Sequence, residues 1–238
     1  MMLGTRTAAW VKSGYTAKDY VQDGLIAMWD GIENAGWGRH DSDITIWKDL
    51  IGGIGDATID RNLITFMTDR VYISQVGRLI VPNYSVSNKD FTLEVCASFI
   101  SMKKEAEFGV IWDNPWLGVN IRGTARVRFT CQADFDFTTD TTKINTYSLT
   151  RGTSGRAFYI SGSSVRNDAT AKTSVATKSL RIGVWQENRT YPNNDTRGNC
   201  FCCRIYERKI TAQEVAANYA VDKARFGIGE EARSDKTT

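Results

Sequence analysis

Aromatic side chains next to amides and carboxylates are the residues of this 238-residue chain that are best suited to chemistry. They occur in the stretch WDNPW, in the stretch WQENRTY and, as a lone tryptophan, in a Gly-rich stretch. A sugar ring is bound by an exposed aromatic face flanked by groups that form hydrogen bonds with its hydroxyls. The pattern predicts a carbohydrate- or protein-binding surface made of Trp37, Trp112, Asp113, Asn114, Trp116, Trp185, Glu187, Asn188 and Tyr191. The alternative is that these aromatic residues close the ends of a hydrophobic core.

The single histidine and the cysteine cluster do not favour a zinc or a nucleophilic site. His40 is followed by Asp41 and Asp43, and three cysteines form a Cys-x-Cys-Cys run over 200–203. Zinc ligands are usually paired at a spacing of two to four residues, which this run lacks. Neighbouring strand residues point to opposite faces, so Cys202 and Cys203 cannot both approach one ion. We therefore expect core packing for these cysteines.

Charge and cysteine content exclude several classes of partner. Thirty basic against 27 acidic residues give a net charge of +3, which is too small to indicate nucleic acid or an anionic membrane. Five cysteines, an odd number without a CxxC motif, favour reduced thiols and synthesis in a cytoplasm. The first residues lack the apolar run of a signal peptide, and no stretch is apolar enough for membrane insertion.

Many short strands with turn residues between them must position the aromatic stretches. Strand-like alternation recurs at 8–12-residue spacing, and it is clearest over 90–100. This pattern predicts an all-β fold, a two-sheet antiparallel jelly-roll sandwich with one short C-terminal helix. We expect residues 1–22 to be an extended leader that docks onto a neighbouring subunit, 23–228 to be one domain, and 229–238 to be a flexible tail.

The helix is predicted from a complete set of start and stop signals. Thr211 and Glu214 match a capping box, Ile210 and Val215 match a hydrophobic staple, and Gly227 is a typical stop. Helical spacing predicts that one side packs on the sandwich through Val215, Tyr219 and Phe226, with Ala212, Ala216 and Ala220 beside them.

Several stretches in order resemble the laminin-G-like domains of the concanavalin A-like lectin/glucanase superfamily. These are DGLIAMWDG…WKDLIGG, FTLEVCASF, YSLTRGTSGRAFYISGSSV, SLRIGVW and CRIYERKITAQEVAANY. The last contains the R-x-Y-x-R strand ending and the T-x-x-E helix start of that family, at Arg204, Tyr206, Arg208, Thr211 and Glu214. The resemblance covers about residues 20–227, and the opening stretch is similar to virion or surface proteins of gut bacteria and their phages.

The resemblance implies a jelly roll that binds carbohydrate or protein, with or without Ca²⁺. Domains of this kind often hold calcium through loop oxygens, and the candidates here are Asp113, Asn114 and Asp195, which are also ordinary turn residues. The superfamily includes glycosidases, which need two carboxylates about 5 Å apart in the retaining case. Glu94 has only Thr92 and Cys96 as same-face neighbours, and Glu105 and Glu107 lie in a charged stretch typical of a solvated turn.

We therefore predict a non-enzymatic binding or structural module, a virion component or a cell-surface protein. Its partner would be a glycan or another protein subunit, and the leader would serve homo-oligomer or virion assembly. A purely structural assembly protein is the close alternative, and a glycoside hydrolase is the distant one.

Overall fold

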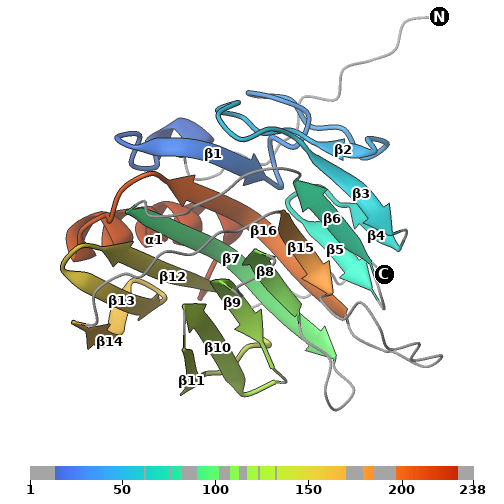
Figure 1. Ribbon diagram of the computed structural model, residues 1–238. Helices are drawn as coiled ribbons and strands as arrows, with labels where there is room; N and C mark the ends of the chain where they lie inside the picture. The colour runs from blue at the N-terminus through green and yellow to red at the C-terminus, as the bar shows by residue number, and fades with distance from the viewer. Residues whose placement is uncertain are drawn as a thin grey trace, which may run out of the picture.

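The computed structural model describes residues 14–61, 63–74, 77–81, 90–101, 108–112, 117–122, 124–131, 133–169, 179–184 and 197–229. For residues 61, 101, 111, 112 and 184 only the backbone is described. The described chain forms two antiparallel sheets packed face to face, with one α-helix, α1 (Ala212–Phe226), near the C-terminus (Figure 1). The prediction of an all-β two-sheet sandwich is confirmed.

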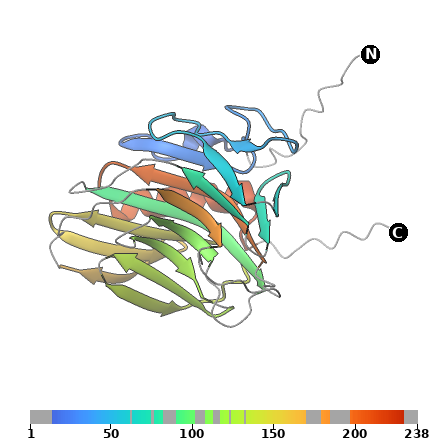
Figure 2. The same cartoon turned by 45° about the vertical axis from the view of Figure 1, so that its right-hand side comes forward.

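Sheet A contains β1 (Leu25–Asp30) and the ordered path β14 (Ser163–Asp168), β13 (Gly155–Ile160), β12 (Asn145–Gly152), β7 (Phe91–Ser101), β16 (Arg197–Tyr206), β5 (Val71–Ser74) and β4 (Ile64–Phe66). Sheet B has the order β11 (Asp134–Thr138), β10 (Arg126–Cys131), β9 (Leu117–Ile121), β8 (Phe108–Trp112), β15 (Leu180–Val184), β6 (Arg78–Val81), β3 (Ala57–Arg61) and β2 (Ile46–Trp47). Figure 2 shows β13 and β14 at one end of sheet A and β4 at the other.

The core fills the space between the sheets and follows the alternation of the strands. On β7 every second residue from Phe91 to Phe99 is buried there, against residues such as Phe129 of β10 and Val119 of β9. Burying one such side chain stabilises the fold by about 1.5–3 kcal/mol. The prediction for residues 90–100 is therefore confirmed, and the intervening residues must face the opposite side of sheet A.

Strand β16 is the centre of sheet A and contains a bulge. It pairs with β7 along one side, while its other side is shared by β5 and β1. The register shifts between Cys200 and Cys202, so that Cys200 and Cys203 lie in the inter-sheet core while Phe201 and Cys202 face outward. Cys202 and Cys203 thus point to opposite faces, as expected from their adjacency.

Helix α1 and the segment before β1 cover the outer face of sheet A (Figures 1 and 2). The capping box is present: the Thr211 Oγ1 accepts from the amide of Glu214 at 3.2 Å, and the Thr211 amide donates to the Glu214 carboxylate at 2.7 Å. Gly227 ends the helix with a left-handed backbone, φ 65°. Ile210 and Val215 are buried in the same apolar cluster, so the helix begins and ends as predicted.

Two expectations about these outer elements need correction. Ala212, Ala216 and Ala220 are exposed, and the side of α1 that packs on the sheet carries Asn218 and Asp222 between its apolar residues. The second correction concerns residues 1–22, which we expected to be an extended leader. The structure describes residues 14–22 of this segment. They include the 3₁₀ helix η1 (Ala17–Asp19) and the buried Tyr20, which packs against α1 of the same chain.

Candidate functional site

The outer face of sheet A carries a buried charge cluster, which consists of Arg204, Glu94 and Asp222. The Arg204 guanidinium donates to both carboxylate oxygens of Asp222, at 2.7 and 2.8 Å, and its Nε donates to Glu94 at 3.0 Å. All three side chains are at most 1 % exposed. A buried charge is tolerated only when it is paired and hydrogen-bonded, and α1 supplies the Asp222 that completes this pairing.

Neutral side chains saturate the remaining oxygens of the cluster. Tyr20 Oη and Thr146 Oγ1 donate to Asp222 at 2.7 and 2.6 Å, and Ser148 Oγ donates to Glu94 at 2.9 Å. Asn218 Nδ2 also donates to Glu94, at 2.7 Å. The Arg204 guanidinium lies 4.0 Å from the centroid of the Tyr20 ring. The cluster therefore joins strand, helix and N-terminal segment.

Burial raises the pKa of Glu94, although the neighbouring Arg204 opposes that rise. A carboxyl of raised pKa is a typical general acid, but this one is fully buried and its two oxygens accept from Ser148, Asn218 and Arg204. A substrate could reach it only if α1 were removed. The cluster holds α1 on sheet A through Asp222 and Asn218, and we call it the structural lock.

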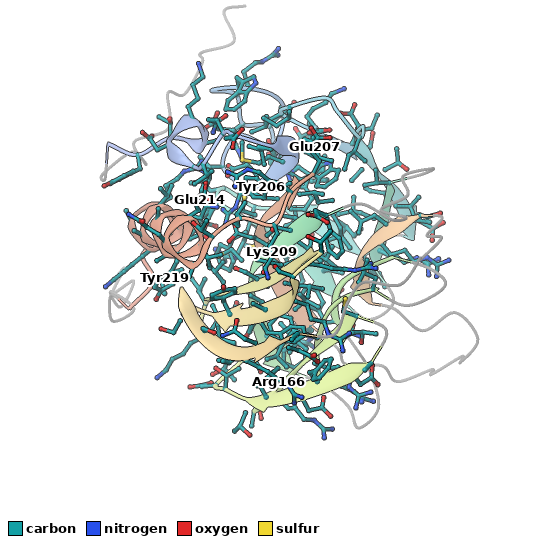
Figure 3. All side chains as sticks on the ribbon, turned by 60° about the vertical axis from the view of Figure 1, so that its left-hand side comes forward. Arg166, Tyr206, Glu207, Lys209, Glu214 and Tyr219 are labelled. Atoms are coloured by element: carbon teal, nitrogen blue, oxygen red, sulfur yellow. The ribbon has the colours of Figure 1, made fainter. Side chains whose placement is uncertain are left out.

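The R-x-Y-x-R motif is explained by this lock. Arg204 is its centre, and the Tyr206 hydroxyl accepts from Asn218 Nδ2 at 2.9 Å. Arg208 lies outside it and forms two hydrogen bonds with Glu214, at 3.0 and 2.6 Å. Figure 3 labels Tyr206 and Glu214 where β16 leads into the helix. The sequence signal for Asn218 and Asp222 was their i, i+4 spacing, which places both on the same side of the helix as Val215.

The outer face of sheet B contains a row of mostly buried residues. Five of its positions lie directly opposite one another across neighbouring strands, namely Arg128, Asn120, Gly109, Gly183 and Arg78. They alternate with core residues, so they belong to the outer face. The two ends of this row are paired ions: Arg128 contacts Asp134 and Asp136, and Arg78 contacts Asp60.

The middle of the row is a strip without side chains. Gly109 and Gly183 are direct partners on β8 and β15, and Gly118 of β9 lies opposite Ile111, two residue pairs further along. A Cβ at position 109 would collide with the Val119 carbonyl, and one at 183 would lie 2.7 Å from the Gly77 carbonyl oxygen. Backbone approach therefore requires glycine at both positions. Beside these glycines lie Asn120, which is 2 % exposed, and Arg181, which is partly exposed.

Most predicted platform residues lie outside the described residues. This applies to Asp113, Asn114, Trp116, Trp185, Glu187, Asn188 and Tyr191. The strand residues next to the two aromatic stretches are described, and they show where each stretch is anchored. Trp112 ends β8 opposite Leu180, whereas Val184, which precedes Trp185, lies opposite Phe108. Four residues of strand, about 13 Å, separate these points, so the two aromatic stretches are anchored at opposite ends of the β8–β15 pair.

Trp37 is the one platform residue whose side chain is described. It is 38 % exposed, and the Lys18 ammonium lies 5.5 Å from the centroid of its ring. The adjacent amide of Gly38 donates to Glu33, which also accepts from Arg225 of α1. Trp37 thus belongs to the sheet A side of the molecule, whereas Trp112 ends a strand of sheet B.

No group of three or more His, Cys, Asp or Glu residues suited to a metal ion occurs among the described residues. His40 Nδ1 lies 3.1 Å from the Ile32 carbonyl oxygen, and Asp41 accepts from the amide of Asp43, so both shape a turn. The calcium candidates Asp113, Asn114 and Asp195 lie outside the described residues. In the described part of the chain, no helix is long and apolar enough to cross a membrane.

No protein-family model matches the chain, and no curated protein matches it. Solved structures do match. Trypanosoma rangeli sialidase in complex with sialic acid gives a TM-score of 0.63 at 15% identity, over 84% of this chain and 33% of that one. Domain 4 of AbnA, a GH43 extracellular arabinanase from Geobacillus stearothermophilus, in complex with arabinotriose, gives 0.60 at 16% identity, over 82% and 98%.

The binding domain of Paraclostridial Mosquitocidal Protein 1 also matches, with a TM-score of 0.60 at 13% identity, over 82% of this chain and 52% of that one. The chain spans about a third of the length of the sialidase. At these identities the likeness shows the fold alone, a two-sheet β-sandwich.

Proposed function

We propose that the protein is a non-catalytic module that binds a glycan through the two aromatic stretches that leave the ends of the β8–β15 pair of sheet B. The observation that carries this proposal is the register of β8 and β15, which anchors the two stretches about 13 Å apart. Trp112 and Trp185 are anchored at opposite ends of the β8–β15 pair, with Gly109 and Gly183 between them. A sugar chain would stack on the aromatic rings of the stretches that leave the two ends of this strand pair.

The similar domain of the arabinanase supports the proposal, because its structure contains arabinotriose and this chain covers 98% of it. Arg181 of β15, which is partly exposed, can donate hydrogen bonds to the hydroxyls of such a ligand. The absence of catalysis is part of the proposal. It is supported by the fully buried position of Glu94, whose raised pKa would otherwise suit a general acid.

Binding to a glycan array, followed by titration of the best oligosaccharide series, tests the proposal. We expect affinity to rise with chain length until the ligand spans the distance between the two aromatic stretches. Trp112→Ala and Trp185→Ala should each weaken binding about tenfold, the value of about 1.4 kcal/mol, while Val165→Ala, at an exposed residue of β14, should not. Equal unfolding midpoints would show that the variants are folded. Binding that survives both Trp substitutions would contradict the proposal.

We further propose that the module is displayed on a virion or a cell surface, as its resemblance to laminin-G-like domains implies. Residues 1–13, which lie outside the described residues, would attach it to a neighbouring subunit. Probing purified particles and cell fractions with an antibody against the module tests the location. If the array shows no glycan and the protein is found within particles, the purely structural assembly role is correct instead.

A further inference from the structure

Cys96 and Cys202 form a cross-strand pair at the centre of sheet A. Cys96 of β7 lies directly opposite Cys202 of β16, and both side chains belong to the apolar cluster on the outer face of that sheet. Among the five cysteines, all of which the structure describes, this is the pair that occupies directly opposed positions on neighbouring strands. The two thiols therefore share one face of the sheet and one position in its register.

The bulge in β16 creates this pairing. Before the bulge, Cys200 pairs with Ala97. If that register continued, Cys202 would lie opposite Val95, but the shift of one residue brings it opposite Cys96. Directly opposed residues of antiparallel strands have Cα atoms about 4.5–5.5 Å apart, and a disulfide spans about 4.4–6.8 Å between Cα atoms. The backbone spacing of this pair is therefore within the range of a disulfide.

Helix α1 closes both ends of the residue row that contains the two thiols. Across sheet A this row consists of Asp30, Cys202, Cys96 and Thr146. At one end, Arg225 of α1 donates to Asp30 at 2.6 and 3.0 Å. At the other end, Thr146 donates to Asp222 of α1 at 2.6 Å. The two cysteines between them are at most 1 % exposed, so a reagent reaches them only after the helix has moved away.

Arg204 distinguishes one thiol from the other once the helix has moved. Its Nη1 donates to Asp222 at 2.7 Å and lies 3.5 Å from Cys202 Sγ. With α1 in place, burial raises the pKa of both thiols, so both stay in the unreactive protonated form. When Asp222 leaves with the helix, the same guanidinium nitrogen is free to bond the sulfur. A neighbouring arginine favours the thiolate, which makes Cys202 the attacking group.

We propose that Cys96 and Cys202 are a site of reversible oxidation, at which a low-molecular-weight disulfide such as oxidised glutathione causes β7 and β16 to be crosslinked. The Cys202 thiolate attacks one sulfur of glutathione disulfide, which forms a mixed disulfide and releases one glutathione thiolate. The Cys96 thiolate then attacks Cys202 Sγ and releases the second. The two protein thiols lose two electrons and two protons, and one glutathione disulfide gains them as two thiols. This site does not depend on glycan binding.

Exposure of the reduced full chain to oxidised glutathione tests the proposal. The remaining thiols are alkylated with iodoacetamide in denaturant, and the digested chain is analysed by mass spectrometry. We expect a linked peptide pair containing Cys96 and Cys202, lighter by about 2 Da for the two hydrogens removed. Tyr20→Ala, which loosens the contact with Asp222, should form the link at least about tenfold faster, and the milder Tyr20→Phe should fall between. A link between Cys200 and Cys203, or no link even in Tyr20→Ala, would overturn the proposal.

Single alanine substitutions separate the roles of the two thiols. Cys96→Ala removes the second attack, so the mixed disulfide with glutathione should accumulate on Cys202. Cys202→Ala removes the attacking group, so glutathione should add to Cys96 at least about tenfold more slowly. Cys131→Ala, at a buried cysteine of the inter-sheet core, is the matched control and should form the link at an unchanged rate. Equal unfolding midpoints confirm folding of the three variants. Equally fast addition to Cys96 and to Cys202 would overturn the role given to Cys202.

Discussion

At the scale of single residues, Arg204 decides how the C-terminal part of the chain folds. It lies on the outer face of β16, where it bonds Glu94 of β7 and Asp222 of α1. Removing two charges from water is costly, and their attraction offsets this only when all hydrogen bonds are satisfied. Tyr20, Thr146, Ser148 and Asn218 satisfy them here. The cluster therefore specifies one position of the helix.

Arg204→Met tests this lock. It keeps most of the side-chain volume but leaves two carboxylates without a cation in a buried space, so we expect the free energy of unfolding to fall by about 3–5 kcal/mol. Urea denaturation measures the change. Arg126→Met, at an exposed arginine of β10, should change stability by less than about 0.5 kcal/mol. A loss below about 1 kcal/mol for Arg204→Met would show that the cluster tolerates unpaired charge.

Glu214 gives a prediction about pH. Hydrogen bonds from Arg208 hold its pKa at about 2, below the ordinary value of 4.5. Its contribution to stability is therefore complete above pH 4.5 and is lost as pH falls through about 2. Glu214→Gln should destabilise by about 1 kcal/mol at pH 7, and the difference from the unmodified protein should vanish toward pH 2. Urea unfolding over this range measures it, and a difference independent of pH would contradict it.

At the scale of elements, α1 and residues 16–22 act as one cover over sheet A. The Val21 amide donates to Asn218 Oδ1 at 2.8 Å, and Tyr20 lies between the helix and Arg204. The hydrophobic contacts of Ala17, Val215 and Phe226 join the same outer cluster. Because α1 and residues 16–22 cover polar groups of one another, we expect neither segment to be stable on sheet A without the other.

Tyr20 variants test whether the cover opens as a unit. Tyr20→Phe removes one hydrogen bond to buried Asp222 and should cost about 1–3 kcal/mol. Tyr20→Ala also leaves a cavity and should cost about 3–5 kcal/mol. Hydrogen exchange should speed up throughout α1 before it changes in β7. Lys223→Ala, on the exposed side of the helix, is the control. Unchanged exchange in α1 of Tyr20→Ala would show that the two elements open separately.

At the scale of the whole molecule, the sandwich is closed by strands far apart in the chain. β16 pairs with β7, β5 and β1, so the last strand cannot be placed until three earlier parts of the chain are present. Such non-local pairing is typical of slow folding. It also buries all five cysteines, none of which forms a disulfide.

These thiols report on global opening. Burial raises the pKa of each of the five, and the thiolate is the reactive form. We expect negligible alkylation by iodoacetamide in the native state and five additions per chain in denaturant, counted by mass spectrometry. Because α1 covers Cys96 and Cys202 only, Tyr20→Ala should label these two first. Rapid native labelling of Cys131 or Cys203 would contradict a closed core.

The sequence alone determined much of this architecture, because local rules govern it. Alternation placed Phe91 to Phe99 in the core, and capping residues determined where α1 begins and ends. The same local signals did not predict that Asn218 and Asp222 are buried. A polar residue is buried only where distant residues bond it, as Glu94 and Arg204 do here. They also could not show that residues 16–22 fold back onto the helix.

Only the tertiary structure decided how the candidate sites are arranged. Aromatic residues near amides can be recognised in the sequence, but strand register determined that Trp112 and Trp185 are anchored at opposite ends of β8–β15 with glycines between them. The close packing of the β4–β5 turn against Gly31 had no signal in the sequence, because it joins residues that are distant in the chain.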